Sequence, residues 1–122
     1  MELKGKKILV VDDDRLFLSQ MEHQLTEEKF HVKCIEKLGD IDTSIESFRP
    51  DLIILDILLD DGDGRLVCND LKNHSATSHI PIVVITGLSF EKISEIECEA
   101  DATLGKPFSM DNLLINITQL LR

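Results

Sequence analysis

Aromatic residues and long apolar runs are scarce in this sequence of 122 residues. It contains no tryptophan, no tyrosine and only five phenylalanines, so aromatic platforms that stack on bases or sugars are not expected. No apolar run approaches the roughly 18 residues that cross a bilayer, and the N-terminal segment has only a four-residue apolar stretch before acidic residues begin. Neither a membrane span nor a secretory signal is predicted, and we expect a cytoplasmic protein.

Positive charge is also scarce. The chain has 13 lysines and arginines against 23 aspartates and glutamates, which gives a formal net charge of −10. A field of this sign repels nucleic-acid phosphates and anionic lipid headgroups. We therefore expect neither nucleic acid nor a membrane surface as a partner of this chain.

The three cysteines, Cys34, Cys68 and Cys98, lie about thirty residues apart. Metal-binding and redox pairs usually have two cysteines within a few residues of each other. The spacing therefore predicts small, buried, apolar side chains in a reducing compartment.

The length fits one domain and is too short for two ordinary ones. A chain of this mass removes roughly two-thirds of its unfolded surface from water, which is enough for stability without disulfides or a structural metal. The sequence has no low-complexity segment or Gly/Ser linker, and its strong patterns extend from near Lys6 to Leu121. We expect one domain over residues 1–122, with no output domain in this chain.

Five short segments have the composition of β-strands. Three of them are apolar on both faces, which is typical of central strands in a parallel sheet covered by helices on both sides. The second and the last are weaker. The five expected strands are residues 8–11, 31–35, 52–55, 80–85 and 102–104.

Segments with helical spacing alternate with these strands. In the first expected helix, Leu16, Met21 and Leu25 are predicted to share one side, flanked by Phe17 and Gln20. The other expected helices are residues 40–48, 64–72, about 89–98 and 109–121. The alternation predicts an α/β fold, a doubly wound five-stranded parallel sheet flanked by five helices, with ligands at the carboxyl ends of the strands.

Helix boundaries have recognisable signals. Asp14 and Ser109 are predicted to cap the N-termini of the first and last helices. Pro50 should end the second helix, because a residue before proline avoids the helical region. The expected apolar face of the last helix is Leu113, Leu114, Ile117, Leu120 and Leu121.

Polar residues that carry chemistry follow four of the expected strands. The strands end in Asp12-Asp13-Asp14, in Asp56, in Thr86-Gly87 and in Lys106-Pro107. In a parallel sheet these ends share one edge, where three carboxylates repel one another unless a cation joins them. Carboxylate oxygens suit Mg²⁺, and the Thr86 hydroxyl with the Lys106 ammonium suits a phosphoryl group.

The motifs ILVVDDD (8–14), DLIILDILLDDGDG (51–64), PIVVITG (81–87) and LGKPF (104–108) resemble those of the receiver domain of bacterial two-component response regulators. The resemblance covers essentially the whole chain and implies the CheY-like, flavodoxin-like (βα)5 fold. It implies a phosphoacceptor signalling domain that catalyses only its own phosphorylation and dephosphorylation. The implied partners are a sensor histidine kinase or histidine phosphotransfer protein, and a downstream output protein or domain.

The resemblance also assigns roles to residues. Asp56 matches the phosphoacceptor, whereas Thr86 and Lys106 match the hydroxyl and the ammonium that bind phosphoryl oxygens. Pro107 matches a proline that typically follows a cis peptide bond. The implied Mg²⁺ ligands are Asp12, Asp13, Asp56 and the backbone carbonyl of Leu58.

The chain departs from the family pattern in three places. Thr103 replaces the aromatic residue of the switch, so the signal is expected to leave by another route. Asp60 occupies the position where a proline is common after the phosphoacceptor in this family. The interval from Thr86 to Lys106 is about two residues shorter than usual, which predicts a trimmed fourth helix. That helix, the fifth strand and the fifth helix form the implied surface for homodimerisation or output binding.

Leu58 and Leu88 occupy positions that influence attack of water on the acyl phosphate in this family. Both are apolar, so neither can orient a water molecule. Slow self-dephosphorylation is predicted.

Two other functions remain open. One is a pseudo-receiver that binds partners without being phosphorylated, which remains open because Thr103 replaces the aromatic switch residue. A haloacid-dehalogenase-like phosphatase would use Asp12 as nucleophile and Asp14 as acid, but the chain is short and Leu16 stands where threonine or valine would follow. Residues 60–64 imitate a calcium loop, yet Leu59 occupies its first ligand position, so we predict a plain acidic loop.

Overall fold

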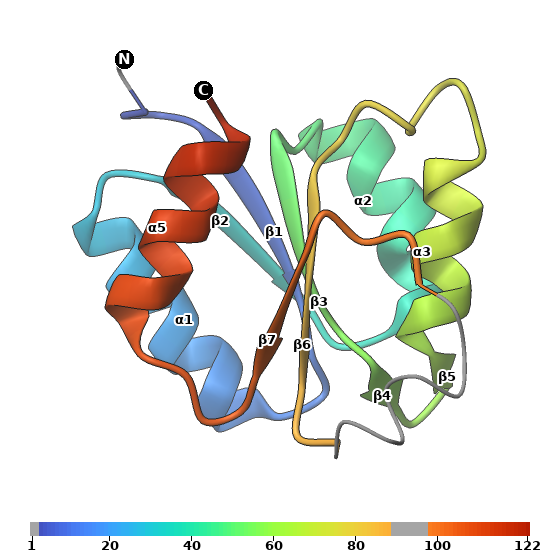
Figure 1. The fold of residues 1–122 in the computed structure, drawn as a ribbon, viewed down its shortest axis with the longest axis horizontal. Coiled ribbons are helices and arrows are strands. Elements are labelled where there is room, and N and C mark those ends of the chain that lie inside the picture. The colour runs from blue at the N-terminus through green and yellow to red at the C-terminus, as the bar shows by residue number, and fades with distance from the viewer. Residues whose placement is uncertain (1–2, 89–97) are drawn as a thin grey trace.

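The apolar segments form a five-stranded parallel sheet in the computed structural model, which describes residues 3–88 and 98–122 (Figure 1). Its strand order is β2-β1-β3-β6-β7, so β1 and β3 lie in its middle. All four neighbouring pairs are parallel. The predicted doubly wound sheet is confirmed, with strands β1 (Lys7–Val11), β2 (His31–Ile35), β3 (Leu52–Asp56), β6 (Ile82–Thr86) and β7 (Ala102–Gly105).

Helices connect these strands and cover both faces of the sheet (Figure 1). The fourth predicted helix lies almost wholly outside the described residues. Among those residues, none of the helices has the length and hydropathy needed to cross a membrane. The remaining elements are α1 (Arg15–Glu27), a 3₁₀ turn (Leu38–Asp40), α2 (Ile41–Phe48), the short antiparallel pair β4 (Leu58–Leu59) and β5 (Gly62–Asp63), α3 (Gly64–Lys72) and α5 (Met110–Leu120).

Alternate residues of each central strand enter two separate cores. One core lies under α1 and α5, and the other under α2 and α3. In β1, for example, Ile8 and Val10 face the first core, whereas Leu9 and Val11 face the second. All four side chains are completely buried, which explains why this strand is apolar on both faces.

The predicted apolar stripe of α1 is wrong at one position. Leu16 is 69% exposed, and the buried side chains of this helix are Leu18, Met21 and Leu25. Residues five apart, such as Leu16 and Met21, differ by about 140° around a helix, whereas positions 18, 21 and 25 share one side. Leu16 therefore faces solvent in the first turn.

Both predicted N-caps are confirmed. The Asp14 carboxylate accepts hydrogen bonds from the backbone N–H groups of Leu16 and Phe17, at 3.0 and 3.2 Å. The Ser109 hydroxyl accepts one from Asn112 at 3.1 Å. On α5 the predicted apolar face is also confirmed: Leu113, Ile117 and Leu121 are buried, and Leu114 and Leu120 pack against them.

Close packing fixes the turn between β3 and α3. The Gly64 backbone N–H donates to the carbonyl of Ile57 at 2.6 Å. A Cβ at position 64 would collide with the backbone carbonyl oxygen of Asp56, because α3 begins directly against the end of β3. A residue without a side chain is needed here.

We predict that Gly64→Ala lowers the free energy of unfolding by about 1–3 kcal/mol, because the added methyl group forces backbone apart in a packed region. Urea denaturation followed by circular dichroism measures this change. Gly87→Ala is the control, since within the described part of the chain no atom lies within 4 Å of a Cβ built there. Equal stability of the two variants would contradict the packing argument.

Candidate functional site

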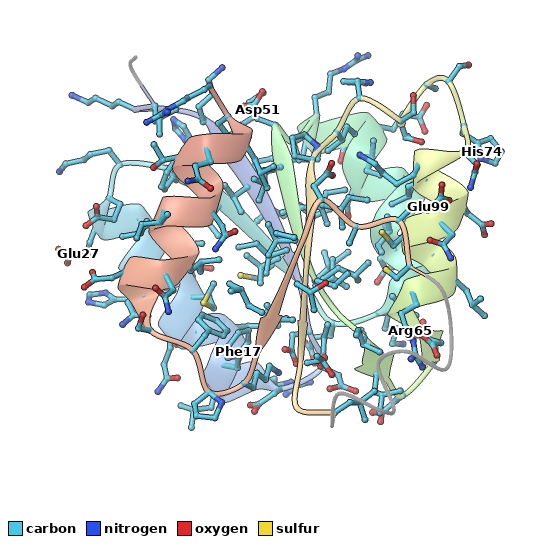
Figure 2. The ribbon with its side chains drawn as sticks, viewed as in Figure 1. Phe17, Glu27, Asp51, Arg65, His74 and Glu99 are labelled. Atoms are coloured by element: carbon cyan, nitrogen blue, oxygen red, sulfur yellow. The ribbon has the colours of Figure 1, made fainter. Side chains whose placement is uncertain are left out.

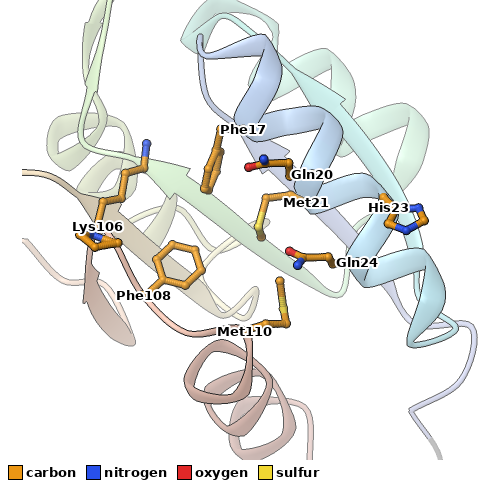
Figure 3. A pocket seen from close by; sticks show the side chains of 9 residues that line it. Phe17, Gln20, Met21, His23, Gln24, Lys106, Phe108 and Met110 are labelled. Carbon is orange, nitrogen blue, oxygen red and sulfur yellow. The ribbon is translucent and has the colours of Figure 1, made fainter.

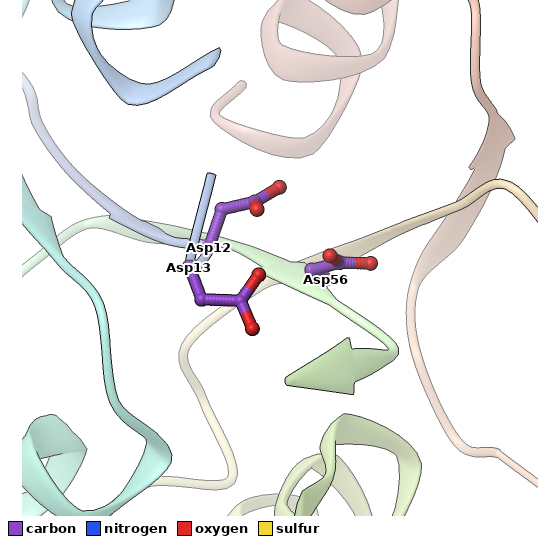
Figure 4. Close-up of side chains that lie close together, drawn as sticks. All are labelled: Asp12, Asp13 and Asp56. Atoms are coloured by element: carbon purple, nitrogen blue, oxygen red, sulfur yellow. The ribbon is translucent and has the colours of Figure 1, made fainter. Parts of the chain in front are cut away.

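Three carboxylates meet at the carboxyl edge of the sheet (Figure 4). Asp12 and Asp13 follow β1, and Asp56 is the last residue of β3. Because β1 and β3 are neighbours, with Val11 opposite Leu55, their ends lie side by side. One oxygen from each carboxylate lies within 4.8 Å of the others. Asp12 and Asp56 are buried, and Asp13 is half-buried.

Lys106 reaches this cluster from the end of β7. Its Nζ lies 2.8 Å from Asp12 Oδ2 and 3.6 Å from Asp56 Oδ2. The ammonium also lies 4.4 Å from the centroid of the Phe17 ring, a cation–π distance. The peptide bond between Lys106 and Pro107 is cis, as the resemblance implied.

The pKa values of Asp56 and Lys106 are both raised, but for different reasons. Burial raises the pKa of Asp56 above its ordinary value, and the Asp12 charge adds to this effect. Lys106 and the backbone N–H groups of Leu58 and Ile57 oppose it. Burial lowers the pKa of Lys106, but the hydrogen bond and charge of Asp12 and the charge of Asp56 outweigh it, so this pKa is raised.

Thr86 lies at the same edge, at the end of β6 and next to β3 in the sheet. Its side chain is buried, and its Oγ1 accepts a hydrogen bond of 2.8 Å from the backbone N–H of Leu88. The Thr86 carbonyl accepts a hydrogen bond of 2.6 Å from the Lys106 backbone N–H. The end of β6 at Thr86 is thus hydrogen-bonded to Lys106 on one side and lies next to the end of β3, at Asp56, on the other.

The predicted acidic loop uses its carboxylates as hydrogen-bond acceptors. Asp61 accepts from the backbone N–H groups of Leu38 and Gly39, both at 3.1 Å, which lowers the pKa of Asp61. Asp63 forms a two-point ion pair with the buried Arg65, at 2.7 and 3.1 Å. Asp61 and Asp63 therefore hold the β4–β5 hairpin in place.

Other contacts were not expected from the sequence. Asp13 Oδ2 accepts a hydrogen bond of 2.9 Å from the Asp60 backbone N–H. Asp12 Oδ1 accepts one of 2.9 Å from Asp14. Phe17 was predicted only as a flank of the helix stripe, and no sequence signal indicated that its ring would lie beside Lys106.

A groove of about 630 Å³ lies beside the site, between α1 and the segment that follows β7 (Figure 3). Phe17 and Phe108 meet edge to face in its wall, with ring centroids 6.1 Å apart. Lys106 lies at the end of the groove nearest the carboxylates. The lining residues are Phe17, Gln20, Met21, His23, Gln24, Lys106, Pro107, Phe108 and Met110.

We predict that Asp56→Asn raises the melting temperature by a few degrees in the presence of a chelator. An aspartate whose pKa is raised by folding destabilises the native state once the pH exceeds that pKa, and asparagine removes this charge. Differential scanning calorimetry at neutral pH measures the shift. The matched control is Asp60→Asn, on an exposed side chain outside the cluster, for which little change is expected. A lower melting temperature for Asp56→Asn would show that the buried charge of Asp56 does not destabilise the native state.

The sequence matches the family of response regulator receiver domains over residues 8–118. It is 35% identical, over its whole length, to the transcriptional regulatory protein GltR of Pseudomonas aeruginosa, of which it covers 51%. The chain spans about half the length of the curated relatives reported by these comparisons.

Solved structures show the same fold. The receiver domain of a signal transduction histidine kinase from Syntrophus aciditrophicus superposes with a TM-score of 0.88 at 28% identity, covering 96% of this chain and 90% of that one. The BeF₃-activated N-terminal receiver domain of Klebsiella pneumoniae RstA gives 0.85 at 28% identity, covering 96% and 99%. The family match, the sheet order and the carboxylate cluster agree, and the chain belongs to the response regulator receiver domain family of two-component signalling.

Proposed function

We propose that this receiver accepts a phosphoryl group on Asp56 from the phosphohistidine of a sensor histidine kinase or of a histidine phosphotransfer protein. The reaction is Mg²⁺-dependent. The observation that carries this proposal is the meeting of Asp12, Asp13 and Asp56 with Lys106 at one sheet edge. A solitary aspartate at a strand end is usually a turn or cap residue, whereas a clustered set with an ammonium favours phosphoryl chemistry.

The donor set fits Mg²⁺. Three carboxylates offer oxygens within 4.8 Å of one another, and hard cations prefer such ligands. Asp12, Asp13 and Asp56 would hold the ion, together with the backbone carbonyl of Leu58, two residues beyond Asp56. When bound, Mg²⁺ neutralises charge on the carboxylates and on the incoming phosphoryl oxygens.

Asp56 acts as the nucleophile. A carboxylate oxygen forms a bond to phosphorus while the bond from phosphorus to the donor's histidine nitrogen breaks, and the electron pair of that bond returns to the nitrogen. Lys106 donates a hydrogen bond to one phosphoryl oxygen. The ammonium already lies 3.6 Å from Asp56, so a small movement from Asp12 brings it to the new group.

Thr86 supplies the second donor and the start of the conformational signal. Its oxygen accepts from the Leu88 backbone N–H, which leaves the hydroxyl proton free to donate. Rotation toward a phosphoryl oxygen would break the hydrogen bond to Leu88 and so alter the chain beyond β6. Phosphorylation would then shift an existing equilibrium between two arrangements of this region.

The signal would reach a protein surface rather than an outside substrate. Thr103 on β7 is exposed and has no aromatic ring to turn inward, so the route differs from the usual switch. We propose that residues 1–122 form one cytoplasmic receiver domain that acts on an output protein or domain. Homodimerisation would use β7, α5 and the fourth predicted helix.

A pseudo-receiver that binds partners without phosphorylation is the second candidate, and the exposed Thr103 favours it. The phosphatase alternative loses its support. Its nucleophile would be Asp12, which is fully buried and engaged with Lys106 and the Asp14 backbone, and the matching family is that of receivers.

We predict that incubation with acetyl phosphate adds one phosphoryl group to the wild type only when Mg²⁺ is present. Intact-mass spectrometry measures the adduct, with BeF₃⁻ binding as a second test of the same site. Asp56→Asn should give no adduct, and Asp60→Asn should be labelled as the wild type is. An adduct that persists in Asp56→Asn would point to another nucleophile, and its absence from a folded wild type would favour the pseudo-receiver.

We also predict slow loss of the phosphoryl group. The side chain of Leu58 is 51% exposed and Leu88 is partly buried, and neither can hydrogen-bond an attacking water molecule. Leu58→Asn should speed hydrolysis by about three- to tenfold, because an amide can orient water. Decay of the adduct in a mass-spectrometric time course gives the rate. Ile115→Asn, on an equally exposed side chain of α5, is the control; identical decay in all three proteins would refute the prediction.

A further inference from the structure

Two cysteines that are distant in the sequence meet on the face of the sheet that α2 and α3 cover. Cys68 lies in α3 and is completely buried, whereas Cys98 is partly exposed and lies shortly before β7. Cys98 packs against the apolar cluster that contains Cys68, and the two thiols lie close enough for each to shift the pKa of the other through a hydrogen bond. The sequence predicted small buried side chains, which is confirmed for Cys68, whereas Cys34 and Cys98 are only partly buried. The spacing carried no sign that Cys68 and Cys98 would meet.

Neighbouring hydrogen bonds hold the two cysteines together. Asn69, which follows Cys68, accepts a hydrogen bond of 2.8 Å on Oδ1 from the backbone N–H of Glu99, which follows Cys98. One helical turn further, Asn73 Nδ2 donates to Glu99 Oε2 at 2.7 Å, and Glu99 lies beside α3 in Figure 2. The approach of the two thiols is therefore supported by backbone and side-chain contacts of the residues that follow each cysteine.

A third contact extends this attachment towards β7. Lys72 Nζ lies 2.9 Å from Asp101, and the same carboxylate accepts a hydrogen bond of 2.8 Å from the Ile82 backbone N–H. Segment 98–101 is thus bound to α3 and to the start of β6. This attachment limits separation of the thiols.

The two thiols differ in reactivity. The hydrogen bond from Cys68 holds the pKa of Cys98 below its ordinary value, and the backbone N–H of Ala100 acts in the same direction. That hydrogen bond and burial raise the pKa of Cys68. Cys34 provides an internal comparison, because burial raises its pKa to about 11. Thiolates are the reactive form, so Cys98 is the most reactive of the three thiols.

We propose that Cys68 and Cys98 form a redox site that a peroxide converts to a disulfide. The Cys98 sulfur attacks one peroxide oxygen, the O–O bond breaks, and the departing oxygen leaves as water, so that Cys98 becomes a sulfenic acid. The Cys68 sulfur then attacks the Cys98 sulfur, the S–O bond breaks, and a second water leaves with the Cys68 proton. Two thiols are oxidised and one peroxide is reduced.

The burial of Cys68 suits it to the second step. It need not meet the peroxide, because its target is the neighbouring sulfur, and burial protects it from other oxidants. The disulfide would close a loop of about thirty residues and would join α3 covalently to the segment before β7. This site shares no residue with the carboxylate cluster and does not depend on phosphorylation of Asp56.

The test uses the full chain, reduced, desalted and treated with hydrogen peroxide at neutral pH under native conditions. Free thiols are then blocked with N-ethylmaleimide, and the protein is digested without reductant. We expect a loss of about 2 Da and a linked peptide pair containing Cys68 and Cys98 as the main product. Cys34→Ser should keep this product, and Cys98→Ser should lose it.

A rate measurement provides a second test that needs no variant of the buried Cys68. In the reduced wild type, iodoacetamide should modify Cys98 at least about tenfold faster than Cys34. The proposal is overturned if Cys34 reacts as fast as Cys98. It is also overturned if peroxide leaves Cys98 as an unlinked sulfinic acid, or pairs it with Cys34 or with another molecule in preference to Cys68.

Discussion

Repulsion among three carboxylates is the constraint on which the functional edge of the sheet depends. Asp12, Asp13 and Asp56 follow or end two central strands whose apolar residues are all completely buried, so their backbones cannot spread to separate the charges. At such distances like charges interact by several kcal/mol when partly shielded from water. The positive charge of Lys106 offsets part of this repulsion, which explains why its ammonium contacts both Asp12 and Asp56. The free energy gained by burying apolar side chains in both cores thus offsets the unfavourable repulsion among the clustered carboxylates.

The same carboxylates also organise the backbone around them. Asp12 accepts a hydrogen bond from Asp14, which caps α1, and Asp13 accepts one from Asp60 in the loop between β4 and β5. Any change in charge at the cluster therefore reaches the start of α1 and the hairpin through single hydrogen bonds. Conformational coupling of this kind needs no long chain of contacts, because the acidic groups are themselves part of the local structure.

Sequence patterns predicted the strands and most of the candidate site for a physical reason. Central parallel strands are apolar on both faces, and the residues after them must share an edge, which placed Asp12 and Asp56 together. Leu16 was misplaced because several apolar residues near a helix start allow more than one stripe. The contacts of Lys106 with Phe17 and of Cys68 with Cys98 depend on how side chains pack between distant segments, for which spacing along the chain gives no signal.

The short edge strand β7 connects the two chemical features of the molecule. Just before its first residue, Asp101 is bound to Lys72 of α3 and to the start of β6. Just after its last residue, Lys106 is bound to the carboxylate cluster. A four-residue strand fixed at both ends cannot slide along its neighbour without breaking one attachment. In the proposed phosphorylation, Lys106 would move slightly to meet the phosphoryl group, and the attachment at Asp101 would limit how much of that movement β7 can share. The proposed disulfide at Cys98, three residues before Asp101, would constrain that same attachment.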